Sequence, residues 1–207
     1  MVIGGYAVTS YGFPRFSVDL DLTIPISEVP FFKDQVRQSG FVFTKGKEDL
    51  AYAGRFERYE KNLVSIDLLI NGVASRQTGY CYPFCYIFKH SHIRETSGWD
   101  PANTVKARIA TKEMLIALKI HSMRTADKRD IIMLCYERPA VHLIITHLKE
   151  GPRKKIQGHI DELRALLRSS ALKDSLKGVY SIDEFIYKKT IKNCDQTMDE
   201  LKKSFSE

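Results

Sequence analysis

The chain has 207 residues, of which 43% are hydrophobic and 28% charged, and its formal net charge is +7. These proportions are typical of a globular protein, and no apolar run approaches the roughly 20 residues that a membrane-spanning helix needs. The positive charge suits an anionic partner such as a nucleotide or RNA, but no dense arginine tract marks a nucleic-acid-binding arm. The first residues lack the basic segment of a secretory signal, so we expect a cytoplasmic protein with reduced thiols.

In chain order, the first half predicts short strands separated by turns rich in Gly, Pro and polar residues. The Gly4-Gly5 pair predicts a tight turn between a short strand and a helix. Residues 29–39 predict a helix, with Pro30 in its first turn. Strands are predicted at residues 17–24, 40–44, 51–59, 63–70 and 86–88.

The second half is helical in pattern. Helices are predicted at residues 112–124, 128–136, 141–149, 155–169, 181–189 and 191–205, with breaks at Gly151-Pro152 and Gly178. The fold class that follows is α+β. We predict a mixed β-sheet flanked by helices over residues 1–110, with a helical C-terminal region, residues 111–207, packing on it.

The predicted strand at residues 17–24 alternates strictly between polar and apolar side chains. Because successive side chains of a strand point to opposite faces, Asp19 and Asp21 share one face, and Val18, Leu20 and Leu22 share the other. Two carboxylates so placed lie about 7 Å apart along the strand, close enough to bind one cation or a pair. The alternative is an ordinary solvated strand face, which is the commoner origin of a lone Asp-x-Asp.

Asp67 is the one charge in the apolar predicted strand 63–70. An unpaired buried carboxylate is costly, so this residue needs an explanation. If the two strands are neighbours, Asp67 joins Asp19 and Asp21, and three close carboxylates require protons or a cation. Oxygen ligands of this kind suit Mg²⁺. The alternative is an edge charge that deters sheet pairing.

Glycine and basic residues provide candidate phosphate contacts. The Gly4-Gly5 turn would offer exposed amides at the start of a helix to an anion. Arg15, shortly before Asp19, would contact a phosphate, pair with the acids, or be an ordinary loop arginine. Lys119 lies on a predicted helix that is apolar on nearly every side, so it should be buried and need a partner. That partner is a triphosphate, a structural carboxylate, or solvent reached by snorkelling.

Taken together, these residues resemble the nucleotidyltransferase superfamily that includes DNA polymerase β. The likeness rests on IGGYAV, on PRFSVDLDL with its Asp19-x-Asp21, and on the solitary Asp67. It is strongest to the abortive-infection type and minimal nucleotidyltransferases of bacterial and archaeal toxin–antitoxin systems. The segment ATKEMLIALKIHSMRTADKRDIIML is similar to their lysine-bearing helix and the Lys-Arg-Asp start of the next one. Met133 stands where relatives often carry a further acid.

The resemblance implies a Mg²⁺-dependent enzyme, with Mn²⁺ as a substitute, that transfers a nucleotide from an NTP to an acceptor hydroxyl and releases pyrophosphate. The acceptor would belong to tRNA or another RNA, a protein or a small molecule. Implied roles are metal binding and catalysis for Asp19, Asp21 and Asp67, nucleotide binding for Gly4, Gly5, Arg15, Ser17 and Lys119, and a place at the rim for Arg129 and Asp130. A toxin or antitoxin partner is implied, and no membrane. The alternative is a catalytically silent protein of this fold that binds a partner.

Two further features have competing interpretations. Cys81, Cys85, His90 and His92 predict either a zinc-held RNA-binding module or an aromatic strand with buried thiols. The aromatic residues between them would stack on a base or pack in the core. The basic groups at residues 153–155 and at Lys188, Lys189 and Lys192 would contact RNA phosphates or form a solvated face.

Overall fold

The structure is a computed structural model that describes residues 1–17, 19–49, 54–97 and 104–206. Val18 and residues 51–53, which belong to two of the predicted strands, lie outside the described residues. Contacts divide the chain into two compact units. The sheet unit comprises Met1–Ser10, Phe16–Ala74 and Cys81–Thr111, and the helical unit comprises Tyr11–Arg15, Ser75–Tyr80 and Lys112–Glu207. Both units are discontinuous in sequence, whereas we predicted an uninterrupted division at residue 110.

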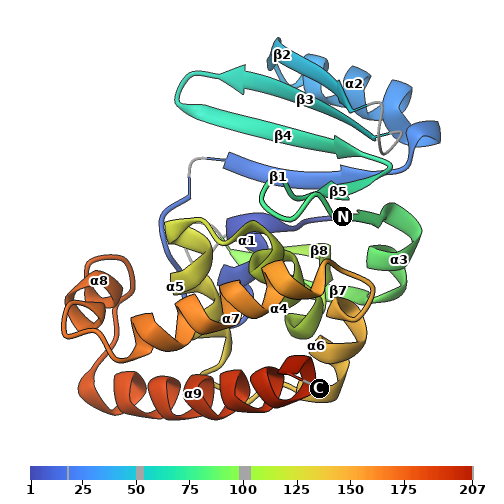
Figure 1. Cartoon of the computed structure of the whole chain (residues 1–207). Coiled ribbons are helices and arrows are strands. Elements are labelled where there is room, and N and C mark those ends of the chain that lie inside the picture. Colours follow the sequence, from blue (N-terminus) through green and yellow to red (C-terminus); the bar gives the residue numbers. More distant parts are fainter. Residues whose placement is uncertain (18, 50–53, 98–103, 207) are drawn as a thin grey trace. The chain divides into compact units, whose positions relative to one another are not determined.

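Four strands form the main sheet of the sheet unit, in the order β1-β4-β3-β2 (Figure 1). They are β1 (Asp19–Ile24), β2 (Val42–Asp49), β3 (Gly54–Lys61) and β4 (Val64–Ile70). Strand β1 runs parallel to β4, whereas β3 is antiparallel to both of its neighbours. Between β1 and β2 the chain passes through the short 3-10 helix η1 (Ile26–Glu28) and helix α2 (Val29–Gln38). The predicted helix at residues 29–39 is therefore confirmed, with Pro30 in its first turn.

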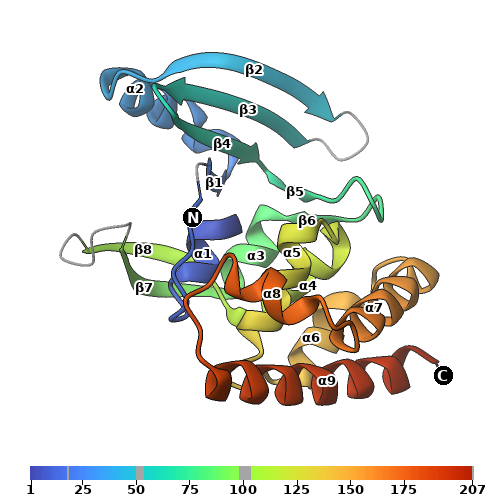
Figure 2. The same cartoon turned by 90° about the vertical axis from the view of Figure 1, so that its left-hand side faces the viewer.

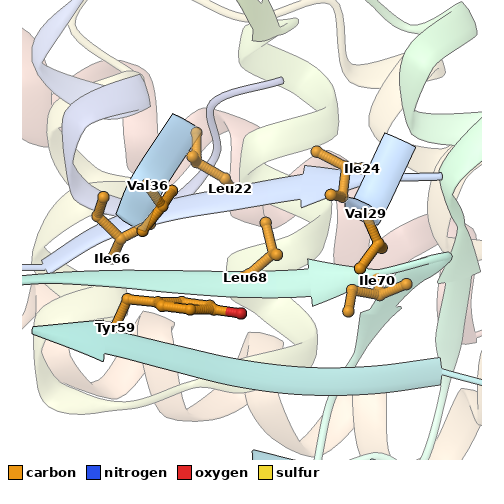
Figure 3. Packing of buried hydrophobic residues seen from close by; sticks show 8 residues of the cluster. All are labelled: Leu22, Ile24, Val29, Val36, Tyr59, Ile66, Leu68 and Ile70. Atoms are coloured by element: carbon orange, nitrogen blue, oxygen red, sulfur yellow. The ribbon is translucent and has the colours of Figure 1, made fainter. Parts of the chain in front are cut away.

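The apolar core of this unit lies between the sheet and α2. It comprises Leu22, Ile24, Val29, Val36, Tyr59, Ile66, Leu68 and Ile70, all buried (Figure 3). The members from β1 and β4 occupy alternate positions, so each strand turns one face to α2 and the other away from it. Full burial of one such side chain stabilises the fold by about 1.5–3 kcal/mol, so a one-residue slip of β1 against β4 would be very costly.

Residue Val2 links this sheet to a second pair of strands. It forms a bridge to Leu22 of β1 and another to Ile109 of β8 (Thr104–Ala110), and helix α1 (Gly4–Thr9) follows it. Strand β8 pairs antiparallel with β7 (Ser91–Ser97). We did not predict this ribbon, although Val105, Ala107 and Ile109 of β8 alternate with two basic residues; β7 offers no such pattern, since Ile93 is its one aliphatic residue. A third short pair joins β5 (Gly72–Ala74) to β6 (Cys81–Pro83).

Residues 86–88, which we predicted to form a strand, belong to helix α3 (Phe84–Lys89). The aromatic residues at even positions suggested the two-residue repeat of a strand. The same positions contain pairs four residues apart, which meet on one side of a helix. Phe84 contacts Phe88 and Tyr86 contacts His90, at ring-centroid distances of 5.5 and 4.7 Å. The prediction was wrong because this spacing satisfies both periods.

Six helices are described in the helical unit, in which α7 and α9 run side by side (Figures 1 and 2). They are α4 (Lys112–Ser122), α5 (Thr125–Leu134), α6 (Val141–Leu148), α7 (Arg153–Leu167), α8 (Leu172–Lys177) and α9 (Glu184–Ser206). Helix α4 is buried on most sides, as its sequence predicts. Helix α9 replaces the two helices predicted at residues 181–189 and 191–205. No helix-breaking residue separates those segments, and Thr190 is fully buried within the single helix.

The predicted α+β class is confirmed, with a mixed sheet, flanking helices and a helical C-terminal region. Each unit has its own buried apolar residues, as the hydrophobic content of the sequence requires. Within the described ranges, no helix is long and apolar enough to cross a bilayer.

Candidate acidic site

Asp19 and Asp21 lie on the face of the sheet that is turned away from the apolar core. Leu20 and Leu22, which alternate with them, pack toward the α2 side. The parallel pairing of β1 with β4 places Asp21 opposite Asp67 and Asp19 opposite Ser65. Because paired strands lie about 4.8 Å apart, the three acids that the sequence singled out occupy one small area of the sheet.

Asp19 and Asp21 are partly exposed, whereas Asp67 is buried. The side chain of Asp19 keeps 39% of its surface exposed, and that of Asp67 keeps 11%. The hydroxyl of Ser65 donates a hydrogen bond to Oδ1 of Asp19. Ser17, predicted to bind the nucleotide, donates instead to the backbone carbonyl of Asp19 at 3.3 Å, and its own carbonyl accepts from Tyr6. In this structure Ser17 therefore holds the chain at the entrance to β1.

The Gly4-Gly5 turn lies directly beside Asp21. The amide of Ile3 donates to the backbone carbonyl of Asp21 at 3.0 Å, which ties the turn to β1. Gly4 has a φ of 66°, and a Cβ added to it would lie 1.9 Å from Oδ2 of Asp21. The structure thus requires glycine at position 4 because the carboxylate of Asp21 approaches it closely. The role of Gly4 and Gly5 in binding phosphate stays a prediction.

Arg58 is the residue of this site that the sequence did not reveal. It lies on β3, paired in register with Asp67 of β4. Its Nε and Nη2 each donate to one carboxylate oxygen of Asp67 at 2.6 Å, and Nη2 lies 3.8 Å from Oδ1 of Asp19. The hydrogen bonds to Asp67 raise the pKa of Arg58 above its ordinary value. The acids are therefore partly neutralised by a guanidinium in a two-pronged geometry, the strongest that this pair can adopt.

The residues present fit a divalent cation only after a rearrangement. Across the ranges that the structure describes, no three His, Cys, Asp or Glu side chains are arranged to hold a metal ion. The Arg58 guanidinium is the stand-in cation, since it contacts both Asp67 and Asp19. Carboxylate oxygens are the ligands that Mg²⁺ prefers. If Arg58 turned away, Asp19, Asp21 and Asp67 would offer the oxygen donors that the sequence predicts.

Four of the predicted site residues belong to the helical unit, and three of them form a buried ionic network. Lys119 is 5% exposed, and its Nζ lies 3.0 Å from Oδ1 of Asp127 and 2.6 Å from Oδ2 of Asp130. Arg15 donates from Nε and Nη2 to the two oxygens of Asp130, at 2.8 and 2.9 Å. The hydroxyl of Tyr180 also donates to Asp130.

In this structure Lys119 and Arg15 pair with buried carboxylates, and their predicted role in nucleotide binding stays a prediction. Of the partners considered for Lys119, a structural carboxylate is the one observed. Arg15 likewise pairs with a buried carboxylate, that of Asp130. Asp130 has no exposed surface, so it does not lie at an accessible rim. Arg129, the other predicted rim residue, is partly buried on α5.

The electrostatics of the network follow from burial and pairing. Burial disfavours the charged form of Asp127, but Lys119 and Arg124 outweigh it and lower the pKa of Asp127 to about 2. Burial likewise opposes the charge of Asp130, yet Lys119 and Arg15 hold its pKa below the ordinary value. Both carboxylates are therefore ionised at neutral pH. Removal of a cation would leave buried charge without compensation.

The predicted cysteine cluster, the aromatic residues around it and the basic residues contact other parts of the chain. Cys81 is partly exposed on β6 and Cys85 exposed on α3, so the expected strand with buried thiols is wrong. Tyr82 is buried and stacks on Tyr86 at 5.8 Å, which places this part of the aromatic group in packing. Among the basic residues, Lys189 pairs with Glu137 and Lys155 donates to the carbonyl of Gln77.

Comparison with known proteins adds no assignment. No protein-family model matches the chain, and no match was found among curated proteins or among solved structures. The chemistry of the acidic site and the resemblance of its residue pattern are therefore the indications of function in this chain.

Proposed function

We propose that this protein is a magnesium-dependent nucleotidyltransferase that moves a nucleotide from an NTP to an acceptor hydroxyl. The observation that supports it best is the register of β1 and β4, which sets Asp21 opposite Asp67 with Asp19 on the same face. The close approach of Gly4 to Asp21 adds a glycine turn at the same place. The glycine and the three acids all belong to the sequence pattern that resembles this superfamily.

In this mechanism, Asp19, Asp21 and Asp67 would hold the metal. Bound Mg²⁺ would polarise the phosphoryl oxygens and favour ionisation of the acceptor hydroxyl. Asp67 accepts the proton of that hydroxyl. The acceptor oxygen then forms a bond to the α-phosphorus, the bond from this phosphorus to the bridging oxygen breaks, and pyrophosphate leaves. The Gly4-Gly5 turn would let the triphosphate approach the backbone.

The biological setting follows from the resemblance alone. A member of the abortive-infection or minimal nucleotidyltransferases would act within a toxin–antitoxin system on an RNA such as tRNA, on a protein or on a small molecule. Lys119 and Arg15 take no part in this proposal, since Asp127 and Asp130 already neutralise them.

A second candidate function is a catalytically silent protein that uses this fold to bind a partner. The observation that favours it is the two-pronged pairing of Arg58 with Asp67, which occupies both oxygens of one of the three acids. A protein that had lost catalysis could keep such a pair permanently.

Label transfer separates the two functions. The purified chain is incubated with each α-labelled NTP, Mg²⁺ and total cell RNA or protein. We expect one class of acceptor to become labelled, and labelling to vanish in Asp19→Asn and Asp21→Asn. Asp34→Asn, at an exposed position on α2, is the matched control and should label normally. Equal labelling by all variants would contradict the assigned site, and absence of labelling with every NTP and acceptor would favour the silent protein.

A further inference from the structure

Arg58 occupies the acidic site in the manner of a bound cation. We propose that Arg58 is an internal counter-ion that excludes divalent metal from the site, so that a metal binds only when the guanidinium leaves Asp67. This inference rests on the proposed function, because it concerns the same three acids. It makes metal entry a competition between an ion pair of the chain and an ion from solution.

The geometry makes the two cations mutually exclusive. Both oxygens of Asp67 accept from Arg58 at 2.6 Å. Magnesium requires oxygen ligands at about 2.0–2.1 Å in a nearly regular octahedron, with the remaining positions taken by water or phosphate. An ion at that distance would meet the guanidinium at the same lone pairs, and the two positive charges would repel each other at short range.

The position of Arg58 allows it to leave. Its side chain is 31% exposed, and it extends from a β-strand toward a site in which Asp19 is 39% exposed. A long side chain with this exposure can reach water when it leaves its carboxylate partner. Asp67, in contrast, is only 11% exposed and is fixed by the register of β4. The arginine is thus the movable member of the pair.

The opposite face of the same strand provides a matched control. Arg55 pairs with Glu57 at 2.8 Å, and Glu57 also binds Lys33 of α2 and the hydroxyl of Tyr59. Arg55 is 34% exposed, close to the value for Arg58. The two arginines therefore share a strand, a charge and a degree of exposure. They differ in whether their partner belongs to the candidate metal site.

The test measures Mn²⁺ binding without nucleotide, by calorimetry or by the loss of the free-ion paramagnetic resonance signal. The variants are Arg58→Gln, Arg55→Gln and the double variant Arg58→Gln with Asp67→Asn, each checked for folding by circular dichroism. We expect Arg58→Gln to bind Mn²⁺ about tenfold or more tightly than the parent chain, as the loss of a charge-assisted two-pronged pair implies. Arg55→Gln should bind as the parent does, and the double variant should lose the gain.

Several outcomes would overturn the inference. They are equal Mn²⁺ affinity of the parent and Arg58→Gln, no binding by either, or an equal gain in Arg55→Gln. If Arg58→Gln fails to fold, Arg58→Lys keeps the charge without the two-pronged geometry and should show a smaller gain; the parent's affinity in that variant would also refute the inference. The label-transfer assay is scored separately. If Arg58→Gln gains Mn²⁺ affinity but no label is transferred, the counter-ion role of Arg58 is supported and the nucleotidyltransferase activity is refuted. If label is transferred but Arg58→Gln gains no Mn²⁺ affinity, the activity is supported and the counter-ion role is refuted.

Discussion

Gly4 and Asp21 are packed so closely that no side chain fits between them. A Cβ at Gly4 would lie 1.9 Å from Oδ2 of Asp21 and 2.6 Å from its Cγ. The φ of Gly4, 66°, lies in the left-handed region, which residues with a side chain adopt only with strain. One glycine therefore fixes both the direction of the chain entering α1 and the space available to an acid of the candidate site.

We expect Gly4→Ala to lower the free energy of unfolding by about 1–3 kcal/mol, since either the turn or Asp21 must move. Urea denaturation followed by circular dichroism measures the change. The control is Gly158→Ala, because Gly158 lies exposed within α7 and a Cβ there meets nothing within 4 Å. That variant should gain about 0.5–1 kcal/mol from helix propensity. Unchanged stability of Gly4→Ala would show that the turn relaxes freely.

Lys119→Met should destabilise the protein by about 3–5 kcal/mol, because it leaves two buried carboxylates short of a cation. The measurement is again the free energy of unfolding at neutral pH. Lys202→Met is the control, since Lys202 pairs with Asp161 at the surface and should lose nothing measurable. A Lys119→Met variant as stable as the parent, but impaired in nucleotide binding, would restore the triphosphate role that the sequence suggested.

Acid should destabilise the protein through His121. Burial, and secondarily the charge of His159, lowers the pKa of His121 to about 4 from an ordinary 6.5. Its Nδ1 lies 2.8 Å from Oγ1 of Thr78, and its ring stacks on Tyr80 at 4.8 Å. Below pH 6.5 the unfolded chain binds a proton that the folded chain does not. Stability is therefore retained above pH 6.5 and lost as the pH falls toward 4, by about 3 kcal/mol in all.

The measurement is urea denaturation at several pH values between 7 and 4. His121→Gln, which cannot titrate, should lose the slope within this window even if it is less stable overall. His142→Gln, at an exposed position on α6, should keep the slope of the parent. A parent chain whose stability is flat between pH 6.5 and 4 would refute the assignment.

The sequence predicted those parts of the site that depend on local pattern. Strict alternation in β1 was enough to place Asp19 and Asp21 on one face, and the isolated charge of Asp67 marked β4. Arg58 could not be found in the same way, because it contacts Asp67 through the register of β3 against β4. Charged and apolar residues are mixed along β3, so nothing local distinguishes Arg58 from Arg55. Only the pairing of the strands does.

The same limit applies to the helices. The apolar surroundings of Lys119 predicted its burial correctly, because burial follows from the helical period. The helical period did not predict the partners of Lys119. Asp127 and Asp130 lie on the next helix, and their direction depends on how α4 packs against α5. Helix α3 was missed for a different reason, because its aromatic residues satisfy the periods of both a strand and a helix.

Asp130 collects donors from three distant stretches of the chain, Arg15, Lys119 and Tyr180. Dissection of the protein at residue 110 would therefore not release an autonomous helical fragment. A piece beginning at Lys112 would lack Arg15, and a carboxylate without solvent access would lose one of its two cations. Such a fragment would lack the loop that carries Arg15, and a short peptide spanning Tyr11–Arg15 could be added to it in trans to supply this cation.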